Sequence, residues 1–354
     1  MAMAPTLERL EARERNEQAE LGRVVRVRWE LLGLEIDGAS QAARQAAKLA
    51  VQRVIAASMA EQPLGSPAFR GTVVLIHGLA QNHRTWHSSA RSLPAHLADH
   101  GYEVLNLDMR GHGLSRRLGA PPARRVDDYV DDLCRLVGAL PRPPFVAGHS
   151  LGAVVGLRSA PRVELAGFVH WAGLYTFARD NPTLRAAARV GLVLDRGVPD
   201  SVAVNWRHAG KLIARLGPVS DAVNAVAPIQ GWGRRSFEVP LLRERVSRGF
   251  DVTGWPVMSE MSRWALGEPI DDGSFAALEA LPLLVFSGES DRLATPEDGL
   301  ACYRASRSQD RRYVLFSAES HGFSAGHLDI VLGERAPRVV WSELLAWLDA
   351  RSTQ

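Results

Sequence analysis

Short, continuously apolar segments alternate with helix-like segments along much of this chain, and this rhythm constrains its fold most strongly. The segment TVVLIHG, residues 72–78, is apolar without alternation, which is typical of a strand buried on both faces of a sheet. The segment VDDYVDDLCRLVGAL, residues 126–140, instead places its apolar residues on one helical face. Further strands are expected at residues 102–108, 144–148, 165–173, 281–288 and 311–317. The alternation predicts an α/β fold, with a mostly parallel sheet and helices on both faces.

The alternation of strand-like and helix-like segments is present in residues 71–175 and 278–354, which are therefore assigned to the α/β core. Residues 176–277 contain helical pieces and several tryptophans but no convincing buried strand, so they are predicted to form a helical cap insertion.

The first 70 residues are predicted to form an N-terminal helical arm. Residues 38–59 are rich in alanine, with apolar spacing near 3.6, which favours a helix. Residues 1–22 read as a polar helix or a mobile arm. Residues 24–32 fit either a strand or a short helix, because apolar and charged residues alternate there.

Composition excludes several classes of protein. The 42 basic and 39 acidic residues are interspersed and give a net charge of +3, so a nucleic-acid partner is not expected. No apolar run reaches the roughly 18 residues that a membrane span needs, so stable membrane insertion is not expected. The N-terminus lacks the apolar segment of a signal peptide, which favours a cytoplasmic protein. Two cysteines, Cys134 and Cys302, allow one bridge but no disulfide framework.

One motif indicates catalysis. Residues 148–152 read Gly-His-Ser-Leu-Gly, a G-x-S-x-G pattern, and they lie between an apolar strand and a helix rich in alanine and valine. A sharp strand-to-helix turn needs small residues at both flanking positions, and it presents the serine above the sheet. Ser150 is therefore the predicted nucleophile.

Five segments in the same order resemble the α/β-hydrolase family: LIHGLAQNHRTW, LNLDMRGHGLS, GHSLG, FSGESDRLATP and GHLDIVLGERAP. Together they cover about residues 71–350. The last segment is similar to the acid-lipase-like branch and to the polyhydroxyalkanoate-synthase-like branch. That synthase uses a cysteine nucleophile, so Ser150 argues against polymer synthesis.

The resemblance implies the chain order nucleophile, acid, histidine. The acid is Asp291, which follows a buried strand and could orient the histidine through its Nδ1. Asp329 and Glu289 are the alternative acids. The general base is His327 by its local pattern, whereas spacing from Asp291 favours His321, so His321 stays the alternative base. A zinc site from His321, His327 and Asp329 would lack a natural fourth ligand.

The oxyanion hole is expected from backbone N–H groups. One belongs to Leu151, the residue after the nucleophile, and the resemblance implies Leu79 for the other. His77 is interpreted as a structural residue that shapes its loop through hydrogen bonds. Asp108, Arg110 and Gly111 are interpreted in the same way for the loop after their strand.

These residues predict a serine hydrolase that acts on carboxylic esters with a hydrophobic acyl group and needs neither metal nor cofactor. Aromatic and methionine side chains of the cap are candidates for the acyl pocket or for the core of the cap: Trp206, Trp232, Trp255, Trp264, Phe237, Phe250, Met258 and Met261. The same triad also serves acyltransferases, haloperoxidases and C–C hydrolases, and the fold also serves catalytically silent binding proteins. No motif indicates the natural substrate or the oligomeric state.

Overall fold

The computed structural model describes residues 5–352 except 21, 37–46, 217–223, 225–230 and 234. In this part of the chain, nine strands form one sheet in the order β1-β2-β3-β5-β4-β6-β7-β10-β11. The strands are β1 (Leu7–Glu20), β2 (Arg23–Glu35), β3 (Lys48–Ala56), β4 (Thr72–Ile76), β5 (Glu103–Asp108), β6 (Phe145–His149), β7 (Gly167–Trp171), β10 (Leu283–Gly288) and β11 (Arg311–Phe316). From β5 to β11 the pairing is parallel, whereas β1, β2, β3 and β5 pair antiparallel. The predicted mostly parallel sheet is confirmed.

Except for the edge strand β11, the parallel strands are buried on both faces, as their largely apolar sequences predict. In β4, Val74 and Ile76 belong to one hydrophobic cluster, whereas Val73 and Leu75 belong to another on the opposite face. The helices of the core are α2 (Leu93–Asp99), α3 (Gly113–Arg117), α4 (Val126–Gly138), α5 (Leu151–Ser159), α11 (Pro296–Ala305), α12 (Ala318–His321), α13 (Asp329–Leu332) and α14 (Val340–Asp349). Two short 3-10 helices span Ala57–Met59 and His83–Thr85.

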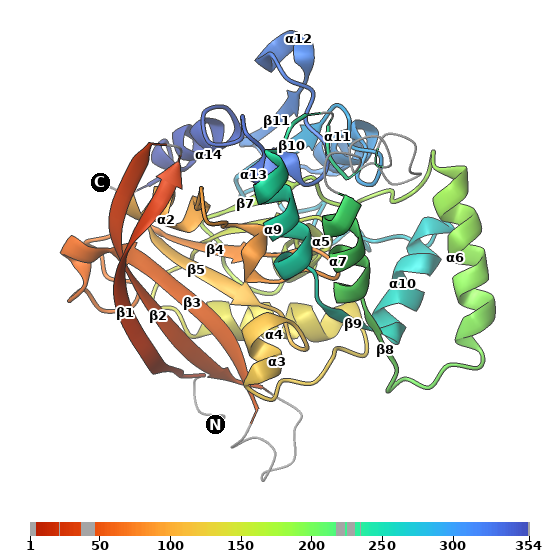
Figure 1. Cartoon of the computed structure of the whole chain (residues 1–354), viewed down its shortest axis with the longest axis horizontal. Coiled ribbons are helices and arrows are strands. Elements are labelled where there is room, and N and C mark those ends of the chain that lie inside the picture. The colour runs from red at the N-terminus through yellow and green to blue at the C-terminus, as the bar shows by residue number, and fades with distance from the viewer. Residues whose placement is uncertain are drawn as a thin grey trace.

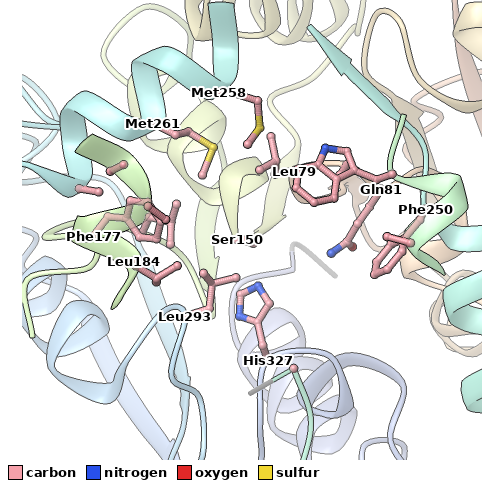
Figure 2. A pocket seen from close by; sticks show the side chains of 18 of the residues that line it. Leu79, Gln81, Ser150, Phe177, Leu184, Phe250, Met258, Met261, Leu293 and His327 are labelled. Carbon is pink, nitrogen blue, oxygen red and sulfur yellow. The ribbon is translucent and has the colours of Figure 1, made fainter. Parts of the chain in front are cut away.

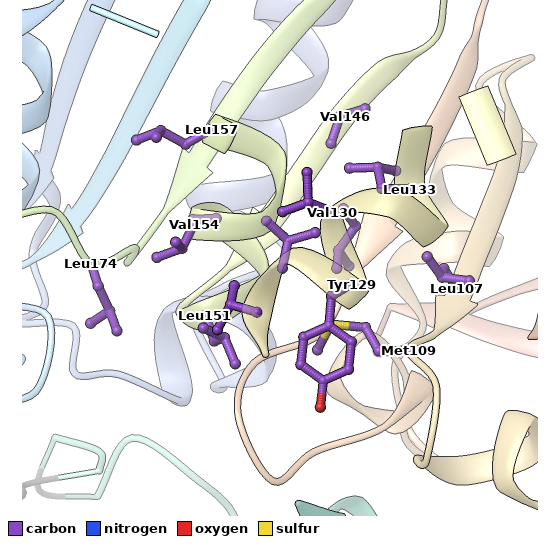
Figure 3. Close-up of a cluster of buried hydrophobic side chains, with 14 of the residues drawn as sticks. Leu107, Met109, Tyr129, Val130, Leu133, Val146, Leu151, Val154, Leu157 and Leu174 are labelled. Carbon is purple, nitrogen blue, oxygen red and sulfur yellow. The ribbon is translucent and has the colours of Figure 1, made fainter. Parts of the chain in front are cut away.

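Each face of the sheet is covered by different helices. Helices α4 and α5 supply buried side chains to the cluster with Val74, and Figure 3 shows Tyr129, Val130 and Leu133 of α4 beside Leu151 and Val154 of α5. Helices α2 and α14 supply Leu93, Trp341 and Trp347, among others, to the opposite cluster. No helix in the described part of the chain is long and apolar enough to cross a membrane.

A cap lies between β7 and β10 in the sequence. It contains α6 (Pro182–Asp195), α7 (Arg207–Leu216), α9 (Val239–Gly249) and α10 (Trp255–Ala265). It also contains two three-residue strands, β8 (Ala203–Asn205) and β9 (Val252–Gly254), which pair antiparallel. The sequence pattern did not predict this ribbon, because segments of three residues are too short to show a period. Figure 1 shows α6 and α10 at the side of the molecule opposite to β1 and β2.

The predicted N-terminal helical arm is wrong. Residues 7–20, 23–35 and 48–56 are strands that extend the sheet beyond β5 (Figure 1). Residues 38–59 have the apolar period of a helix in the sequence. In the structure, residues 48–56 form a strand that buries Leu49 and Val51 on one face and Val54 on the other. Pairing with both β2 and β5 outweighs the helical propensity of the alanines. Residues 37–46 lie outside the described part.

The two cysteines do not form the bridge that the sequence allowed. Cys134 is on α4 and Cys302 on α11, and both are unpaired.

A buried ionic cluster fastens the N-terminal strands to the core. Arg53 of β3 donates from Nε to Glu103 of β5 at 2.6 Å and from Nη1 to Glu30 of β2 at 2.8 Å. Its Nη2 donates to the carbonyl of Gln62 at 2.8 Å, so three of its nitrogens are satisfied. All three charged side chains are at most 4 % exposed. Removing the arginine would leave Glu103 buried without its cation, whereas Glu30 would keep its pair with Arg28 at 3.0 Å.

We expect Arg53→Met to lower the free energy of unfolding by about 3–5 kcal/mol, because it leaves Glu103 buried without its cation and removes one of the ion pairs of Glu30. Urea unfolding followed by tryptophan fluorescence measures this change. The matched control is Arg26→Met, which breaks the solvent-exposed pair with Glu14 and should change stability by no more than about 1 kcal/mol. Equal effects of the two substitutions would contradict the role given to the buried cluster.

Candidate active site

Ser150 occupies a strained turn between β6 and α5. Its φ is +57°, a conformation that side-chain-bearing residues rarely adopt, and α5 begins at the next residue. A Cβ at Gly148 would lie 2.2 Å from the carbonyl oxygen of Gly152, and one at Gly152 would lie 2.4 Å from that of Ile76. Neither position therefore tolerates a side chain, as the motif predicts. The Ser150 N–H donates to the carbonyl of Trp171 at 3.1 Å.

The structure brings Asp291 and His327 together. His327 Nδ1 lies 2.7 Å from Asp291 Oδ2, and both side chains are buried. Asp291 Oδ1 accepts hydrogen bonds from the N–H groups of Leu293 and Ala294 at 2.8 and 2.9 Å. An ionised carboxylate only accepts, so it holds the imidazole in the tautomer with the proton on Nδ1. His327 Nε2 is then the basic nitrogen, and it is buried without a partner among the described residues.

His321 lies elsewhere. It ends the short helix α12, where its Nδ1 is 2.7 Å from Ser320 Oγ and its ring packs against Phe316. Figure 1 shows α12 projecting from the body of the molecule. Asp291 makes its hydrogen bond to His327 and not to His321. The arrangement therefore favours His327, which the local sequence pattern indicated, over His321, which the spacing from Asp291 indicated.

The alternative acids serve other groups. Asp329 accepts from the N–H groups of Gly326 at 2.8 Å and Gly233 at 3.2 Å, and burial raises its pKa to about 6. Glu289 is exposed and accepts from the N–H of Ala318. The three residues of the alternative zinc set are not assembled, and the described part of the chain contains no group of three metal-ligating side chains.

The loop after β4 forms a tight turn beside Ser150. The Gln81 N–H donates to the carbonyl of Gly78 at 3.3 Å, and Ala80 has a φ of +57°. The carbonyl of Ala80 accepts from the N–H of Asp251, in the cap, at 2.7 Å. Leu79 lines the same cavity as Ser150. Leu151 is the first residue of α5, so its N–H has no acceptor within the helix.

His77 supports this turn from behind. Its Nδ1 donates to the carbonyl of Gly78 at 2.9 Å, and its Nε2 accepts from the N–H of Met109 at 3.1 Å. Complete burial lowers the pKa of His77 to about 3, so the ring stays neutral. The predicted structural role of His77 is confirmed by these bonds.

The loop after β5 is fixed in the predicted way as well. Asp108 accepts from the N–H groups of His83 and Leu114 at 2.6 and 2.7 Å. Arg110 forms an ion pair with Asp132, with Nε 2.7 Å from Oδ2.

His149, inside the G-x-S-x-G motif, makes a contact that the sequence did not reveal. Its Nε2 donates to the backbone carbonyl of His327 at 2.9 Å, and the two rings lie 4.7 Å apart. Burial, followed by the neighbouring His327, holds the pKa of His149 well below its usual range. A neutral His149 therefore positions the backbone of His327 without competing for its proton.

An apolar cavity of about 560 Å³ lies above Ser150 and His327, a size typical of small-molecule sites (Figure 2). The cap forms most of its wall. Of the side chains proposed for it, those that line the cavity are Trp206, Trp232, Trp255, Phe250, Met258 and Met261. Trp264 and Phe237 pack in the hydrophobic clusters instead. The cavity is also lined by Phe177, Leu184 and Ala188. The apolar face of α6 is the sequence feature that could have indicated Leu184 and Ala188.

Comparisons with known proteins agree with this fold. A model described as the alpha/beta hydrolase family matches residues 73–343. Epoxide hydrolase B of Mycobacterium tuberculosis is 36% identical over 84 residues, which are 23% of this chain and 22% of that protein. The (E)-2-((N-methylformamido)methylene)succinate hydrolase of Acinetobacter baylyi is 33% identical over 96 residues, 27% of this chain and 32% of the relative. The matches therefore span less than a third of either curated relative.

Two solved structures are similar across their whole length. The monoacylglycerol lipase of Paleococcus ferrophilus superimposes with a TM-score of 0.57 at 20% identity, covering 86% of this chain and 99% of that one. A soluble variant of the monoglyceride lipase of Saccharomyces cerevisiae gives 0.59 at 17% identity, covering 87% and 93%. These likenesses establish the fold, and the family match extends over most of the sequence. The chain therefore belongs to the alpha/beta hydrolase family.

Proposed function

We propose that this protein is a serine hydrolase that cleaves carboxylic esters with a hydrophobic acyl group, using Ser150, His327 and Asp291. One observation carries the proposal: His327, oriented by Asp291, shares an apolar cavity with the strained Ser150, and its Nε2 has no partner among the described residues. A buried imidazole nitrogen without a partner carries a desolvation cost, and a catalytic role is one explanation for such a group. The cavity wall supports an apolar acyl group.

In the proposed reaction, His327 Nε2 takes the proton of Ser150 Oγ as the oxygen attacks the ester carbonyl carbon. The carbonyl π electrons move to the oxygen, and the N–H groups of Leu79 and Leu151 stabilise the resulting oxyanion. The oxyanion collapses, the ester C–O bond breaks, and the imidazolium donates its proton to the leaving alkoxide. Water then repeats the sequence and releases the acid. Asp291 stays ionised and stabilises the imidazolium throughout.

Ser150→Ala should abolish covalent labelling by a fluorophosphonate probe, because the probe reacts with an activated serine oxygen. It should also lower kcat/KM for p-nitrophenyl butyrate by at least about 10³-fold. In-gel fluorescence and release of p-nitrophenol measure the two effects. Ser159→Ala, on the same helix but bonded to the carbonyl of Val155, is the matched control and should keep both activities. Folded wild-type protein that does not react with the probe would contradict the proposal.

His327→Ala should lower kcat/KM for the same ester by about 10²- to 10⁴-fold, the range for loss of a general base. His321→Ala should change it by less than about threefold, because His321 bonds to Ser320 on a projecting helix. Steady-state kinetics of both variants, with melting temperatures to verify folding, provide the test. The reverse order of effects would make His321 the base.

Ala188→Trp should reduce the acyl chain length that the enzyme accepts, because Ala188 is buried on α6 and faces the cavity. We expect kcat/KM for p-nitrophenyl decanoate to fall at least about tenfold relative to that for the acetate. Ala186→Trp is the matched control, since Ala186 is exposed on the same helix. An unchanged ratio of decanoate to acetate in Ala188→Trp would show that the acyl chain binds elsewhere.

A further inference from the structure

Gln81 reaches the reacting centre from the same turn that presents Leu79. Its side chain is 4 % exposed and lines the cavity. A Cβ built on Gly78 would lie 3.0 Å from Ser150 Cβ and 3.3 Å from Gln81 Nε2, so the nucleophile and the amide nitrogen flank the same point. Figure 2 shows the amide of Gln81 at the edge of the cavity, with its nitrogen turned toward Ser150 and His327. No sequence pattern indicated a role for this residue.

The orientation of the amide is determined by its partners. Gln81 Oε1 accepts from Arg245 Nη2 and from Thr85 Oγ1, both at 2.7 Å. A guanidinium carries only donors, so the amide atom beside it must be the oxygen. The NH₂ group therefore faces the other way, into the cavity. Distances alone do not distinguish the amide oxygen from the amide nitrogen. The guanidinium does, because it can only donate.

Arg245 is a buried cation without a counter-ion. It is 3 % exposed, and no carboxylate among the described residues lies within ion-pair distance of it. Burial lowers the pKa of Arg245 to about 10, so the guanidinium is still protonated at pH 8. Gly249 makes room for it, since a Cβ there would lie 2.1 Å from Nη1. Nε and Nη1 have no acceptor in the described part of the chain.

An uncompensated buried charge destabilises the folded protein, and such costly groups are typical of functional sites. We propose that Gln81 Nε2 is a third donor to the oxyanion. Arg245 is the positioning residue that holds the amide in this orientation. The inference rests on the proposed serine-hydrolase function and deepens it, since it adds a side-chain donor to the backbone N–H groups of Leu79 and Leu151.

Two substitutions remove the donor in different ways. Gln81→Leu removes both polar atoms. Gln81→Glu keeps the shape and gives Arg245 a carboxylate partner, so it should fold at least as stably as the wild type, but it has no N–H to donate. We expect each to lower kcat for p-nitrophenyl butyrate by about 10²- to 10³-fold with KM changed less than about threefold. Gln309→Leu, at an exposed position, is the matched control and should behave as wild type.

A trifluoromethyl ketone of the same chain length separates transition-state contacts from substrate contacts, because Ser150 converts it to a hemiketal oxyanion. Its inhibition constant should rise in Gln81→Leu and Gln81→Glu in proportion to the loss of kcat/KM. Arg245→Met should also lower kcat. The kcat of the double variant, Gln81→Leu with Arg245→Met, should lie within about threefold of that of the slower single variant, because Arg245 acts through Gln81.

The outcomes distinguish the two proposals. If wild-type Ser150 reacts with a fluorophosphonate and hydrolyses the ester, but both Gln81 variants keep wild-type kcat or lose activity through KM alone, the role of Gln81 is overturned and the function stands. Fully additive losses in the double variant overturn the role of Arg245 as a positioning residue. Unlabelled, inactive wild type overturns the function and this inference together.

Discussion

The backbone at Ser150 is the constraint on which the rest of the site depends. A φ of +57° at a serine persists only where surrounding contacts hold it. Here β6 pairs in parallel with β4 and β7, and the N–H of Ser150 is bonded to the carbonyl of Trp171. The absence of side chains at Gly148 and Gly152 lets α5 start directly against the end of β4. The central sheet is therefore the support that orients the proposed nucleophile.

The cap does more than enclose the cavity, because it is bonded to the turn that carries Leu79 and Gln81. Asp251 donates from its N–H to the carbonyl of Ala80, and its Oδ2 accepts from the N–H of Gly113 at 2.8 Å. Asn82 donates from Nδ2 to the carbonyl of Arg248 at 3.0 Å. Cap residues thus support a strained turn of the core, so the shape of the apolar cavity and the geometry of the proposed oxyanion hole are physically coupled.

Local sequence patterns were sufficient where the structure depends on neighbours in the chain. The strands β4, β5 and β6 are largely apolar and are buried on both faces over five or six residues, and the G-x-S-x-G turn needs its two glycines within two residues of Ser150. The same reasoning failed for residues 48–56. Their alanines favour a helix, but these residues form a strand that pairs with both β2 and β5, and that pairing is invisible in the local sequence.

The sequence by itself determined the fold class, the turn at Ser150 and the set of candidate acids and bases, because each follows from a short pattern. Only the tertiary structure decided which histidine meets Asp291, since His321 and His327 are six residues apart and the fold turns only one toward the carboxylate. It also brought Arg245 to Gln81, across 164 residues. A hydrogen bond between distant segments leaves no local pattern, because it depends on how the intervening chain folds back on the sheet.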